Sequence, residues 1–581
     1  MRIAIVDNEK LKDMARKKHI QSICPVNRAG KECIRIEDDG KMTIVESLCI
    51  GCGLCPKAAP EAIKIINLPE ALKEEPVHRY GENMFALYSL PTPTFGNVVG
   101  IIGVNGIGKS TAIKILAQII KPNIGNYKKE GDFKLLLEKF KGTEAQTFFE
   151  KIRDGKITVS YKPQQVSLIP KNTLGKVEHL LRKVDQKDKF DEVVEKLQLK
   201  NFLQNDISKI SGGELQRVAI AATVLKKADV YIFDEPTTYL DIKQRLLTAK
   251  FIKSMVEEDV AVMVIEHDLI ALDFMTDYVH IMYGKETGYG VVSQKKSSKV
   301  GINAFLHGYL KDDNIRFRDH TIKFEVKPPS ITYQREKIVE WPKITKKLGN
   351  FKLTVNPGEI KKRTIVGILG ENGTGKTSFV KILAGIDKAD NIELKTNLKI
   401  SYKPQYIEND RDELVINYLQ EAMKKHHEII KTLNLQDLMM SKLNELSGGE
   451  LQKVEIAKAL AKDAQLVLLD EPSAYLDIEQ RLIVAKMIKN IAELKGISVL
   501  VVDHDLLFLD YLSDELIVFK GEPAIHGTAE GPMTMEQGMN SLLKEVNITL
   551  RREEQSGRPR INKEESLKDR EQKENGNYYY S

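Results

Sequence analysis

Two short stretches of the chain place a lysine and a hydroxyl where they could hold the phosphates of a nucleotide. The stretches "GVNGIGKST" (103–111) and "GENGTGKTS" (370–378) both fit the pattern G-x4-G-K-[ST]. The first continues from the apolar run "VVGIIG" into the helical run "TAIKILAQII", which is the strand–loop–helix context of a phosphate-binding loop. In such a loop, backbone N–H groups face a phosphate at a helix N-terminus. The predicted nucleotide contacts here are Asn105, Gly106, Gly108, Lys109, Ser110, Thr111, Asn372, Gly373, Gly375, Lys376, Thr377 and Ser378.

Two further runs, "VYIFDE" and "LVLLDE", are predicted to be buried strands that end in a pair of acids. The first acid of each pair could hold Mg²⁺, and the second could act as general base toward the attacking water. A histidine follows in "EHD" and "DHD", where it could contact the γ-phosphate and the water. The predicted catalytic residues are Glu235, His267, Glu471 and His504. The predicted magnesium ligands are Ser110, Gln164, Asp234, Thr377, Gln405 and Asp470.

These motifs occur twice in the same order, which indicates a duplicated domain. "YKPQQ" (161–165) returns as "YKPQY" (402–406), and "ISGGELQRVAIA" (210–221) returns as "LSGGELQKVEIA" (446–457). The period exceeds 200 residues, so the chain is not a solenoid. The first copy carries extra residues before its glutamine, including 139–156, which predict a helix with Phe148, Phe149 and Ile152 on one side. This insertion is either a partner-binding surface or a tolerated loop.

The stretch "SGGELQ" sets the chain apart from other enzymes with a phosphate-binding loop. A serine and two glycines open a helix, which gives a second anion-binding N-terminus. The combination resembles the ATP-binding-cassette (ABC) ATPases. The resemblance implies that each signature closes over the ATP of the opposite cassette, with Asp241 and Asp477 at the seam. It adds to the predicted ATP contacts Ser211, Gly212, Gly213, Ser447, Gly448 and Gly449.

Aromatic residues upstream of each phosphate-binding loop are predicted to stack on adenine. Tyr80 and Phe85 are the candidates in the first copy. Phe351 is the candidate in the second copy, with Trp341 as its rival. Packing in the core remains an alternative for each of them.

The totals describe a soluble globular chain of more than one domain. It has 581 residues, 42% hydrophobic and 29% charged, with a formal net charge of +6. No apolar run is long enough to cross a bilayer, and no signal peptide is predicted, so we expect a cytoplasmic protein without a membrane partner. All five cysteines lie in the first 55 residues. An odd, clustered set favours metal binding over disulfides.

The stretch "LCIGCGLCPKAAPEAI" (48–63) resembles half of a bacterial ferredoxin, with Ala59 where the last cysteine should stand. End to end, the chain resembles the E subfamily of ABC proteins, the ribosome-recycling ATPases of RNase L inhibitor type, and especially their archaeal members. The stretches that carry this resemblance include "CPVNRAGKECI", "NGIGKSTAIKILA", "GINAFLHGYLKD" and the tail "GRPRINKEESLKDREQK".

That family binds two [4Fe–4S] clusters through eight cysteines. Here the counterparts of one cluster's four ligands are Leu11, Arg16, Ile20 and Ala59. In two-cluster ferredoxins the cysteine before proline ligates the other cluster. The resemblance therefore implies one [4Fe–4S] cluster, with Cys33 as a spare buried thiol and the second site filled by protein. Zn²⁺ on the same thiols and a metal-free domain remain alternatives. The predicted ligands are Cys24, Cys49, Cys52 and Cys55.

The expected fold is α/β, with two ABC-type nucleotide-binding domains in tandem behind a small α+β ferredoxin-like domain. The expected parts are the iron–sulfur domain 1–72, the cassette 73–297, a hinge 298–318, the second cassette 319–550, and a C-terminal hinge and tail 551–581. The resemblance implies a monomer whose two cassettes form an intramolecular dimer.

The same resemblance implies that ATP and Mg²⁺ drive the splitting of 70S-type ribosomes after termination. The expected partners are the small ribosomal subunit with its RNA and a release factor. The alternative is an ATP-bound scaffold or anti-association factor in translation initiation or ribosome biogenesis. Contacts with ribosomal RNA are expected at 139–156, 300–318 and 551–573. The tail offers cations for phosphates at Arg551, Arg552, Arg558, Arg560 and Lys563.

Overall fold

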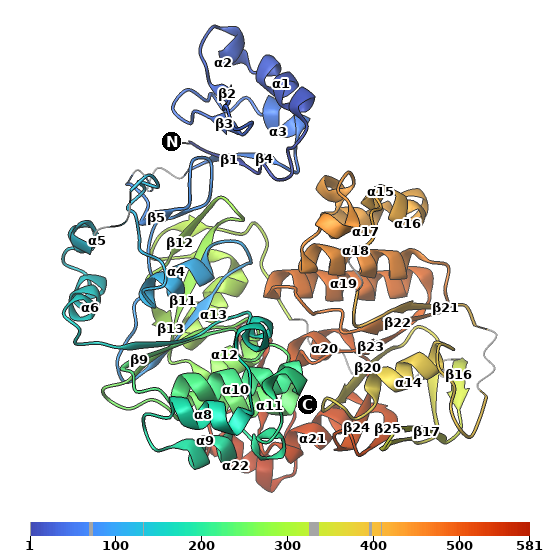
Figure 1. Cartoon of the computed structure of the whole chain (residues 1–581). Helices are drawn as coiled ribbons and strands as arrows, with labels where there is room; N and C mark the ends of the chain where they lie inside the picture. The colour runs from blue at the N-terminus through green and yellow to red at the C-terminus, as the bar shows by residue number, and fades with distance from the viewer. Residues whose placement is uncertain are drawn as a thin grey trace. The chain divides into compact units, whose positions relative to one another are not determined.

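The computed structural model describes residues 2–68, 72, 74–129, 131, 133–324, 336–393, 398–407 and 410–580 (Figure 1). The chain divides into two compact units. Unit 1 comprises Met1–Pro236, Phe251–His267 and Met275–Thr321. Unit 2 comprises Thr237–Lys250, Asp268–Phe274 and Ile322–Ser581. The predicted boundary after residue 72 adjoins 69–71 and 73, which lie outside the described residues.

The N-terminal part of unit 1 is a small α+β region with its own apolar core. β1 pairs antiparallel with β4, from Arg2↔Asn67 to Val6↔Ile63, and β2 and β3 form a hairpin. Asp13 caps α1 by accepting a hydrogen bond from the Ala15 N–H at 2.9 Å. The elements are β1 (Arg2–Val6), α1 (Met14–Ile23), α2 (Pro25–Arg28), β2 (Ile34–Ile36), β3 (Met42–Ile44), α3 (Leu54–Ala58) and β4 (Ile63–Asn67).

Unit 1 also contains the sheet of the first copy of the repeat. Its strand order is β5-β6-β12-β11-β7-β10-β9-β8, with β13 paired to β11, and its centre is parallel. Strands covered on both faces are apolar throughout, which explains runs such as "VVGII" and "AVMVI". The strands are β5 (His78–Arg79), β6 (Ala86–Leu87), β7 (Val98–Ile102), β8 (Val159–Lys162), β9 (Val230–Asp234), β10 (Ala261–Ile265), β11 (Tyr278–Lys285), β12 (Tyr289–Val292) and β13 (Lys296–Ser297).

Helices follow the strands of the first copy along the chain. The first of them, α4, begins at Lys109, directly after the phosphate-binding loop. The α-helices are α4 (Lys109–Leu116), α5 (Phe133–Lys139), α6 (Glu144–Arg153), α7 (Ile169–Asn172), α8 (Val177–Val184), α9 (Phe190–Lys196), α10 (Gly212–Val224), α11 (Ile242–Lys253), α12 (Leu269–Met275) and α13 (Ser298–His307). Short 3₁₀ turns occur at η2 (Val166–Leu168), η3 (Lys200–Phe202) and η4 (Ile207–Lys209).

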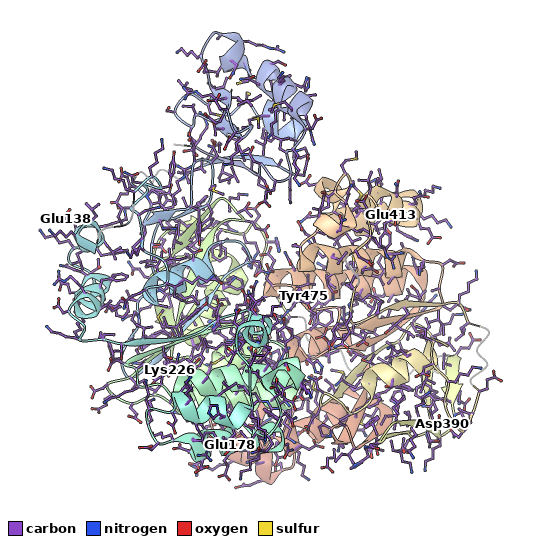
Figure 2. The ribbon with its side chains drawn as sticks, viewed as in Figure 1. Glu138, Glu178, Lys226, Asp390, Glu413 and Tyr475 are labelled. Carbon is purple, nitrogen blue, oxygen red and sulfur yellow. The ribbon has the colours of Figure 1, made fainter. Side chains whose placement is uncertain are left out.

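The insertion predicted at 139–156 contains the end of α5 and the whole of α6. Thr143 caps α6, so the helix begins at Glu144 and not at the start of the predicted segment. Phe148, Phe149 and Ile152 do share one side, and that side is buried in the core of the first copy. The opposite side is charged and exposed. Figure 2 labels Glu138 on the neighbouring helix α5.

The second copy in unit 2 repeats the central strand order of the first. Its sheet runs β17-β18-β25-β24-β20-β23-β22-β21, and β20 is parallel to both β23 and β24. β16 pairs separately with β19. The strands are β16 (Lys337–Trp341), β17 (Ile344–Leu348), β18 (Phe351–Val355), β19 (Gly358–Lys361), β20 (Ile365–Gly370), β21 (Ile400–Lys403), β22 (Leu466–Asp470), β23 (Ser498–Val502), β24 (Glu515–Glu522) and β25 (His526–Thr534).

The helices of the second copy also follow the order of the first. They are α14 (Lys376–Leu383), α15 (Val415–Tyr418), α16 (Gln420–Lys425), α17 (His427–Thr432), α18 (Gly448–Ala461), α19 (Ile478–Lys495), α20 (Leu506–Leu512) and α21 (Met535–Glu545), with 3₁₀ turns η5 (Gln436–Leu438) and η6 (Leu443–Glu445). The duplication read from the motifs therefore extends to whole domains. In both copies the predicted catalytic side chains stand at the carboxyl ends of parallel strands, where α/β sheets bind ligands.

The two predicted hinge segments are folded. Residues 298–318 hold α13, β14 (Tyr309–Leu310) and β15 (Ile315–Arg316), all within unit 1. The C-terminal segment holds β26 (Leu550–Arg552), β27 (Pro559–Ile561) and α22 (Leu567–Glu574), within unit 2. Across the described residues, no helix has both the length and the apolar character needed to span a bilayer.

Three of the tail arginines form ion pairs inside unit 2, and the predicted role in binding RNA phosphates is wrong for the one that is fully buried, Arg558. Arg558 is fully buried, with its Nη1 2.8 Å from Asp273 Oδ2, and Arg560 Nε reaches the same oxygen at 2.8 Å. Arg552 Nη1 lies 3.6 Å from Asp510 Oδ2. Both aspartates stand six residues after a predicted catalytic histidine. The tail therefore fastens the helices α12 and α20, which follow those histidines.

Candidate functional site

Each phosphate-binding loop curls around its own lysine. Lys109 Nζ donates to the carbonyls of Gly103 (2.9 Å) and Val104 (2.7 Å). Lys376 Nζ makes the equivalent bonds at 2.9 and 2.7 Å. Burial lowers the pKa of Lys376 to about 8. An anionic phosphate beside the Lys376 ammonium would raise that pKa again, so the second loop is suited to receive one.

A glycine is required at position 108 of the first loop. Its φ is +88°, and a Cβ there would lie 2.5 Å from Phe85 Cζ. Gly375 has a φ of +95°, and its Cβ would lie 3.2 Å from the ring of Phe351. Phe85 and Phe351 therefore occupy equivalent places against the two loops.

The other aromatic candidates differ in exposure. Tyr80 is 49% exposed, and its hydroxyl lies 3.0 Å from Thr111 Oγ1 on α4. Trp341 is 1% exposed, with its Nε1 donating to the Asn356 carbonyl at 3.0 Å. Trp341 is thus a core residue and has no face free to stack on adenine, which leaves Phe351 as the candidate of the second copy.

The predicted base, glutamine and histidine come together in both copies. In the first, Gln164 Nε2 donates to Glu235 Oε1 at 2.7 Å, and His267 Nε2 lies 3.5 Å from the same oxygen. In the second, Gln405 and His504 stand at the same 2.7 and 3.5 Å from one oxygen of the equivalent glutamate. In each copy, two other segments of the chain thus reach the same carboxylate oxygen, which fixes where a proton can be accepted.

Burial separates the roles of the paired acids. Asp234 and Asp470 are fully buried, and burial raises the pKa of both, that of Asp470 to about 6. Burial also acts to raise the pKa of Glu471, but His504 and the nearby lysine ammoniums outweigh it and lower that pKa. This lowering favours the ionised form of Glu471, which its predicted role as general base requires.

The side chains at the end of each strand fit Mg²⁺. The Ser110 and Thr377 hydroxyls interact with Asp234 and Asp470 and act to lower the pKa of these carboxyls, but burial outweighs them. Asp234 Oδ1 is buried without a hydrogen-bond partner among the described side chains. A hydroxyl, a carboxylate and a glutamine oxygen are hard donors of the kind that Mg²⁺ prefers.

The two predicted catalytic glutamates have an unusual backbone. Glu235 and Glu471 both have a φ of +49°, in the left-handed region. A residue other than glycine there costs about 1–3 kcal/mol and persists only when its surroundings hold it. The N–H of Glu235 donates to the Ile265 carbonyl at 2.9 Å, and that of Glu471 donates to the Val502 carbonyl at 2.8 Å.

The carbonyls of these glutamates are held by two residues to which the sequence analysis assigned no role. The Glu235 carbonyl accepts from Gln216 Nε2 at 2.6 Å and from Lys162 Nζ at 3.2 Å. The second copy repeats both bonds with Gln452 (2.6 Å) and Lys403 (3.3 Å). The available signal was their recurrence in "YKPQ" and "SGGELQ" of both copies.

The signature serines cap their helices. Ser211 Oγ accepts from the Glu214 N–H at 3.3 Å, and the Ser211 N–H donates to the Glu214 carboxylate at 2.7 Å. Ser447 and Glu450 form the same capping box. Ser211, Ser447 and the glycine after each are exposed, so both helix N-termini are open to an anion.

The predicted seam aspartate of the first copy contacts the second phosphate-binding loop, and both belong to unit 2. Asp241 Oδ2 accepts a hydrogen bond from the Asn372 N–H at 3.0 Å. Two residues further on, Lys243 pairs with Glu371 of that loop at 2.7 Å. This part of the first copy therefore lies against the ATP-binding loop of the second.

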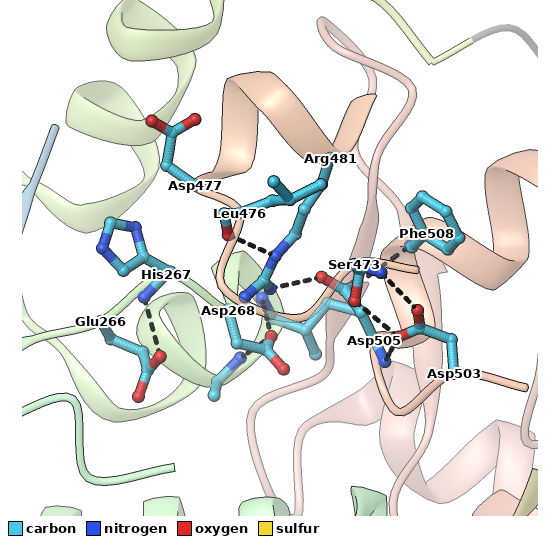
Figure 3. A network of polar contacts seen from close by, with 12 residues as sticks. Glu266, His267, Asp268, Ser473, Leu476, Asp477, Arg481, Asp503, Asp505 and Phe508 are labelled. Atoms are coloured by element: carbon cyan, nitrogen blue, oxygen red, sulfur yellow. Dashed lines mark hydrogen bonds and ion pairs between the residues drawn. The ribbon is translucent and has the colours of Figure 1, made fainter. Parts of the chain in front are cut away.

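An arginine after each predicted seam aspartate bonds the loop that follows the predicted catalytic histidine. Figure 3 shows Arg481 between the Leu476 carbonyl (2.9 Å) and the Asp505 carboxylate (2.7 Å). Asp505 directly follows His504. The equivalent Arg245 makes the same two contacts in its copy. Figure 2 labels Tyr475 just before this segment.

All five cysteines line one pocket in the N-terminal region, with apolar walls that include Val26, Ile34 and Ile65. Burial and then the charges of the neighbouring thiols raise the pKa of Cys55 to about 12, and burial and its neighbours raise the pKa of Cys33 to about 12. In the described part of the chain, no three metal-ligating side chains have the arrangement of a metal site. The donor set still fits an iron–sulfur cluster or Zn²⁺, since clustered thiolates need a cation between them.

The four positions aligned with a second cluster hold no thiol. Leu11, Ile20 and Ala59 are buried in the core of the N-terminal region. Arg16 donates to the Ala58 carbonyl at 2.8 Å and pairs with Glu61 at 2.6 Å. An apolar core and an ion pair thus occupy this side of the region.

Two sheets of this topology, each with a phosphate-binding loop, a signature helix and a strand ending in Asp-Glu, define tandem ATP-binding cassettes. The family model described as ABC transporter matches residues 93–238 and 348–474. The chain belongs to the ABC transporter E family. It is 41% identical over its whole length to ABC transporter E family member 1 of Arabidopsis thaliana, covering 98% of that protein. It is 49% identical to an uncharacterized ABC transporter ATP-binding protein of Methanocaldococcus jannaschii, with 100% of this chain and 98% of that protein covered.

Two solved structures extend this similarity. A model of ribosome-bound archaeal Pelota and ABCE1 matches all of this chain and 99% of its own, with a TM-score of 0.92 and 48% identity. A crystal structure of the archaeal ribosomal stalk protein aP1 with the archaeal ribosome recycling factor aABCE1 has a TM-score of 0.84 at 49% identity. It covers 88% of this chain and 100% of its own. The expected fold of tandem cassettes and the expected ATPase class are confirmed.

Proposed function

We propose that this chain splits ribosomes into subunits after termination, using ATP binding and hydrolysis. The observation that carries the proposal is full-length similarity, at 48% identity, to a ribosome-bound protein. The presence of the predicted catalytic set in both copies supports it, since a pure scaffold has no need of two general bases. The expected partners are the small subunit with its RNA, the 70S-type ribosome and a release factor, in the cytoplasm.

The chain's own residues account for each part of hydrolysis. Lys109 and Lys376 bind the β- and γ-phosphates, while the loop N–H groups orient them in line with the water. Glu235 and Glu471 accept the proton of the attacking water at Oε1. His267 and His504 lie beside that oxygen and contact the γ-phosphate. Mg²⁺, when bound at the hydroxyl, aspartate and glutamine ligands, would neutralise the charge of the phosphates.

We infer that the signature helix of each cassette completes the ATP site of the other. The exposed helix N-termini at Ser211 and Ser447 support this, because the start of a helix is a favourable site for a phosphate. The contact of Asp241 with the Asn372 N–H supports it as well. ATP would then join the cassettes, and hydrolysis would release them, as a γ-phosphate biases other two-state switches.

The N-terminal region is proposed to hold one [4Fe–4S] cluster, bound by Cys24, Cys49, Cys52 and Cys55. The shared pocket and the thiol donor set support this assignment. The cluster would fix the region as a rigid wedge; Zn²⁺ on the same thiols is the alternative. Contact with ribosomal RNA is proposed for the charged side of α6, where Lys151 and Arg153 are exposed.

Co-sedimentation tests the proposed partner. With a non-hydrolysable ATP analogue, the chain should pellet with isolated small ribosomal subunits, and with ADP it should stay in the supernatant. The reason is that only a γ-phosphate closes the cassettes in this account. Large subunits alone serve as the control. Equal recovery with both nucleotides, or recovery with neither, would contradict the proposal.

A further inference from the structure

We propose that Lys162 and Gln216, and likewise Lys403 and Gln452, are positioning residues that set the catalytic glutamate of their own cassette. We call each pair a backbone clamp, because both members donate to the main-chain carbonyl of that glutamate. The proposal rests on ATP hydrolysis at the two sites. It does not depend on the ribosome being the target.

Three elements meet on each catalytic glutamate. Its N–H is bound by the next parallel strand, at Ile265 in the first copy. Its carbonyl is bound by a lysine on β8 and by a glutamine on the signature helix α10. The second copy repeats each donor–acceptor distance to within 0.1 Å. Both main-chain polar groups of the base are therefore fixed from outside its own strand.

Packing of the core does not explain why a lysine stands at positions 162 and 403. Lys162 and Lys403 are both fully buried. Each bonds two successive carbonyls, those of the aspartate (2.9 and 2.8 Å) and of the glutamate. Burying an ammonium is costly, and an apolar side chain of similar size would fill the space without that cost. A buried lysine occurs here in both copies. This indicates that its bonds to the carbonyls serve the site, at a cost to the stability of the core.

The consequence of the clamp is the direction of the catalytic carboxylate. A left-handed backbone at the glutamate turns its side chain away from the direction of the strand. Its Oε1 atom can then reach the histidine and the other glutamine, Gln164 or Gln405. Without the donors, the residue can relax to the ordinary region of φ and withdraw Oε1 from both. A displacement of about 1 Å is enough to cost roughly 100-fold in rate.

The glutamine of the backbone clamp also links the catalytic glutamate to the signature helix. Gln216 is five residues after Ser211, about 7.5 Å along a rigid helix. If the signature contacts the ATP of the opposite cassette, as proposed above, movement of its N-terminus reaches Glu235 through one hydrogen bond. The clamp is thus a direct route by which one ATP can adjust the base of the other site.

The test replaces both lysines together, as Lys162→Met and Lys403→Met. Intrinsic ATP turnover should fall roughly 10- to 100-fold while ATP affinity stays within about threefold, because the phosphate-binding loops are untouched. The control is Lys495→Met: Lys495 Nζ also donates to successive carbonyls, those of Leu460 (2.7 Å), Ala461 (3.2 Å) and Lys462 (3.5 Å), away from the base. This control should keep its turnover.

Two further measurements separate positioning from general damage to the fold. Added to Glu235→Gln and Glu471→Gln, the lysine changes should cause no further loss, because no base remains to be positioned. Gln216→Leu with Gln452→Leu should reproduce the loss of turnover at unchanged ATP affinity. This second pair of changes tests the proposal even if the lysine variants fail to fold. Unchanged turnover, a parallel fall in ATP affinity, or a further loss without the bases would overturn the proposal.

Discussion

Replacing Glu235 and Glu471 together by glutamine should slow ATP hydrolysis by roughly 10²- to 10⁴-fold, the usual contribution of a general base. An amide cannot accept the proton of the attacking water. It keeps the shape of the side chain and can still accept the hydrogen bond from Gln164 or Gln405. ATP binding should therefore persist, and the variant should accumulate with intact ATP bound. Phosphate release and retained nucleotide measure the two effects.

Exposed Glu413 supplies the control, since Glu413→Gln changes the same functional group away from either site. It should hydrolyse ATP at the unaltered rate. Comparing Glu235→Gln and Glu471→Gln singly would then give the share of turnover at each site. Hydrolysis that survives in the double variant would show that another group activates the water.

Replacing Cys24 by serine should remove the iron from the N-terminal region, whereas replacing Cys33 should leave it in place. Anaerobically purified protein should contain about four iron and four acid-labile sulfide per chain, as one [4Fe–4S] cluster requires. Cys33 is a demanding control, because it lines the same pocket as the four proposed ligands. Zinc is counted in parallel.

The outcomes distinguish the alternatives for this pocket. Iron lost from Cys24→Ser and kept in Cys33→Ser supports the proposed ligands. Equal loss in both variants would place Cys33 in the ligand set. One zinc without sulfide would mean that a structural ion takes the place of the cluster, and no metal at all would contradict the assignment outright.

The sequence was sufficient for the features that depend on residue type and order. Phosphate-binding loops, paired acids and signatures recur with fixed spacing, so the duplication and the meeting of Gln164, Glu235 and His267 could be predicted. Each of these side chains is predicted to act through its own functional group. Residue types are therefore enough to predict their roles before any fold is known.

The features that sequence analysis missed depend on burial or on main-chain atoms. The backbone clamp binds a carbonyl, which every residue has, so nothing in the sequence marks Glu235 as its acceptor. Arg558 was predicted to bind RNA phosphates, but in the structure it forms a buried ion pair with Asp273. Trp341 and Phe351 are both aromatic, and only their depth separates a core residue from a candidate for adenine.

Ribosome dissociation tests the central claim most directly. Post-termination 70S-type ribosomes would be mixed with the chain and a release factor, and the subunits separated on a sucrose gradient. We predict free subunits with ATP, and intact ribosomes with ADP or with the Lys109→Met, Lys376→Met variant. Ribosomes that stay joined with ATP, or that separate equally well without nucleotide, would contradict it.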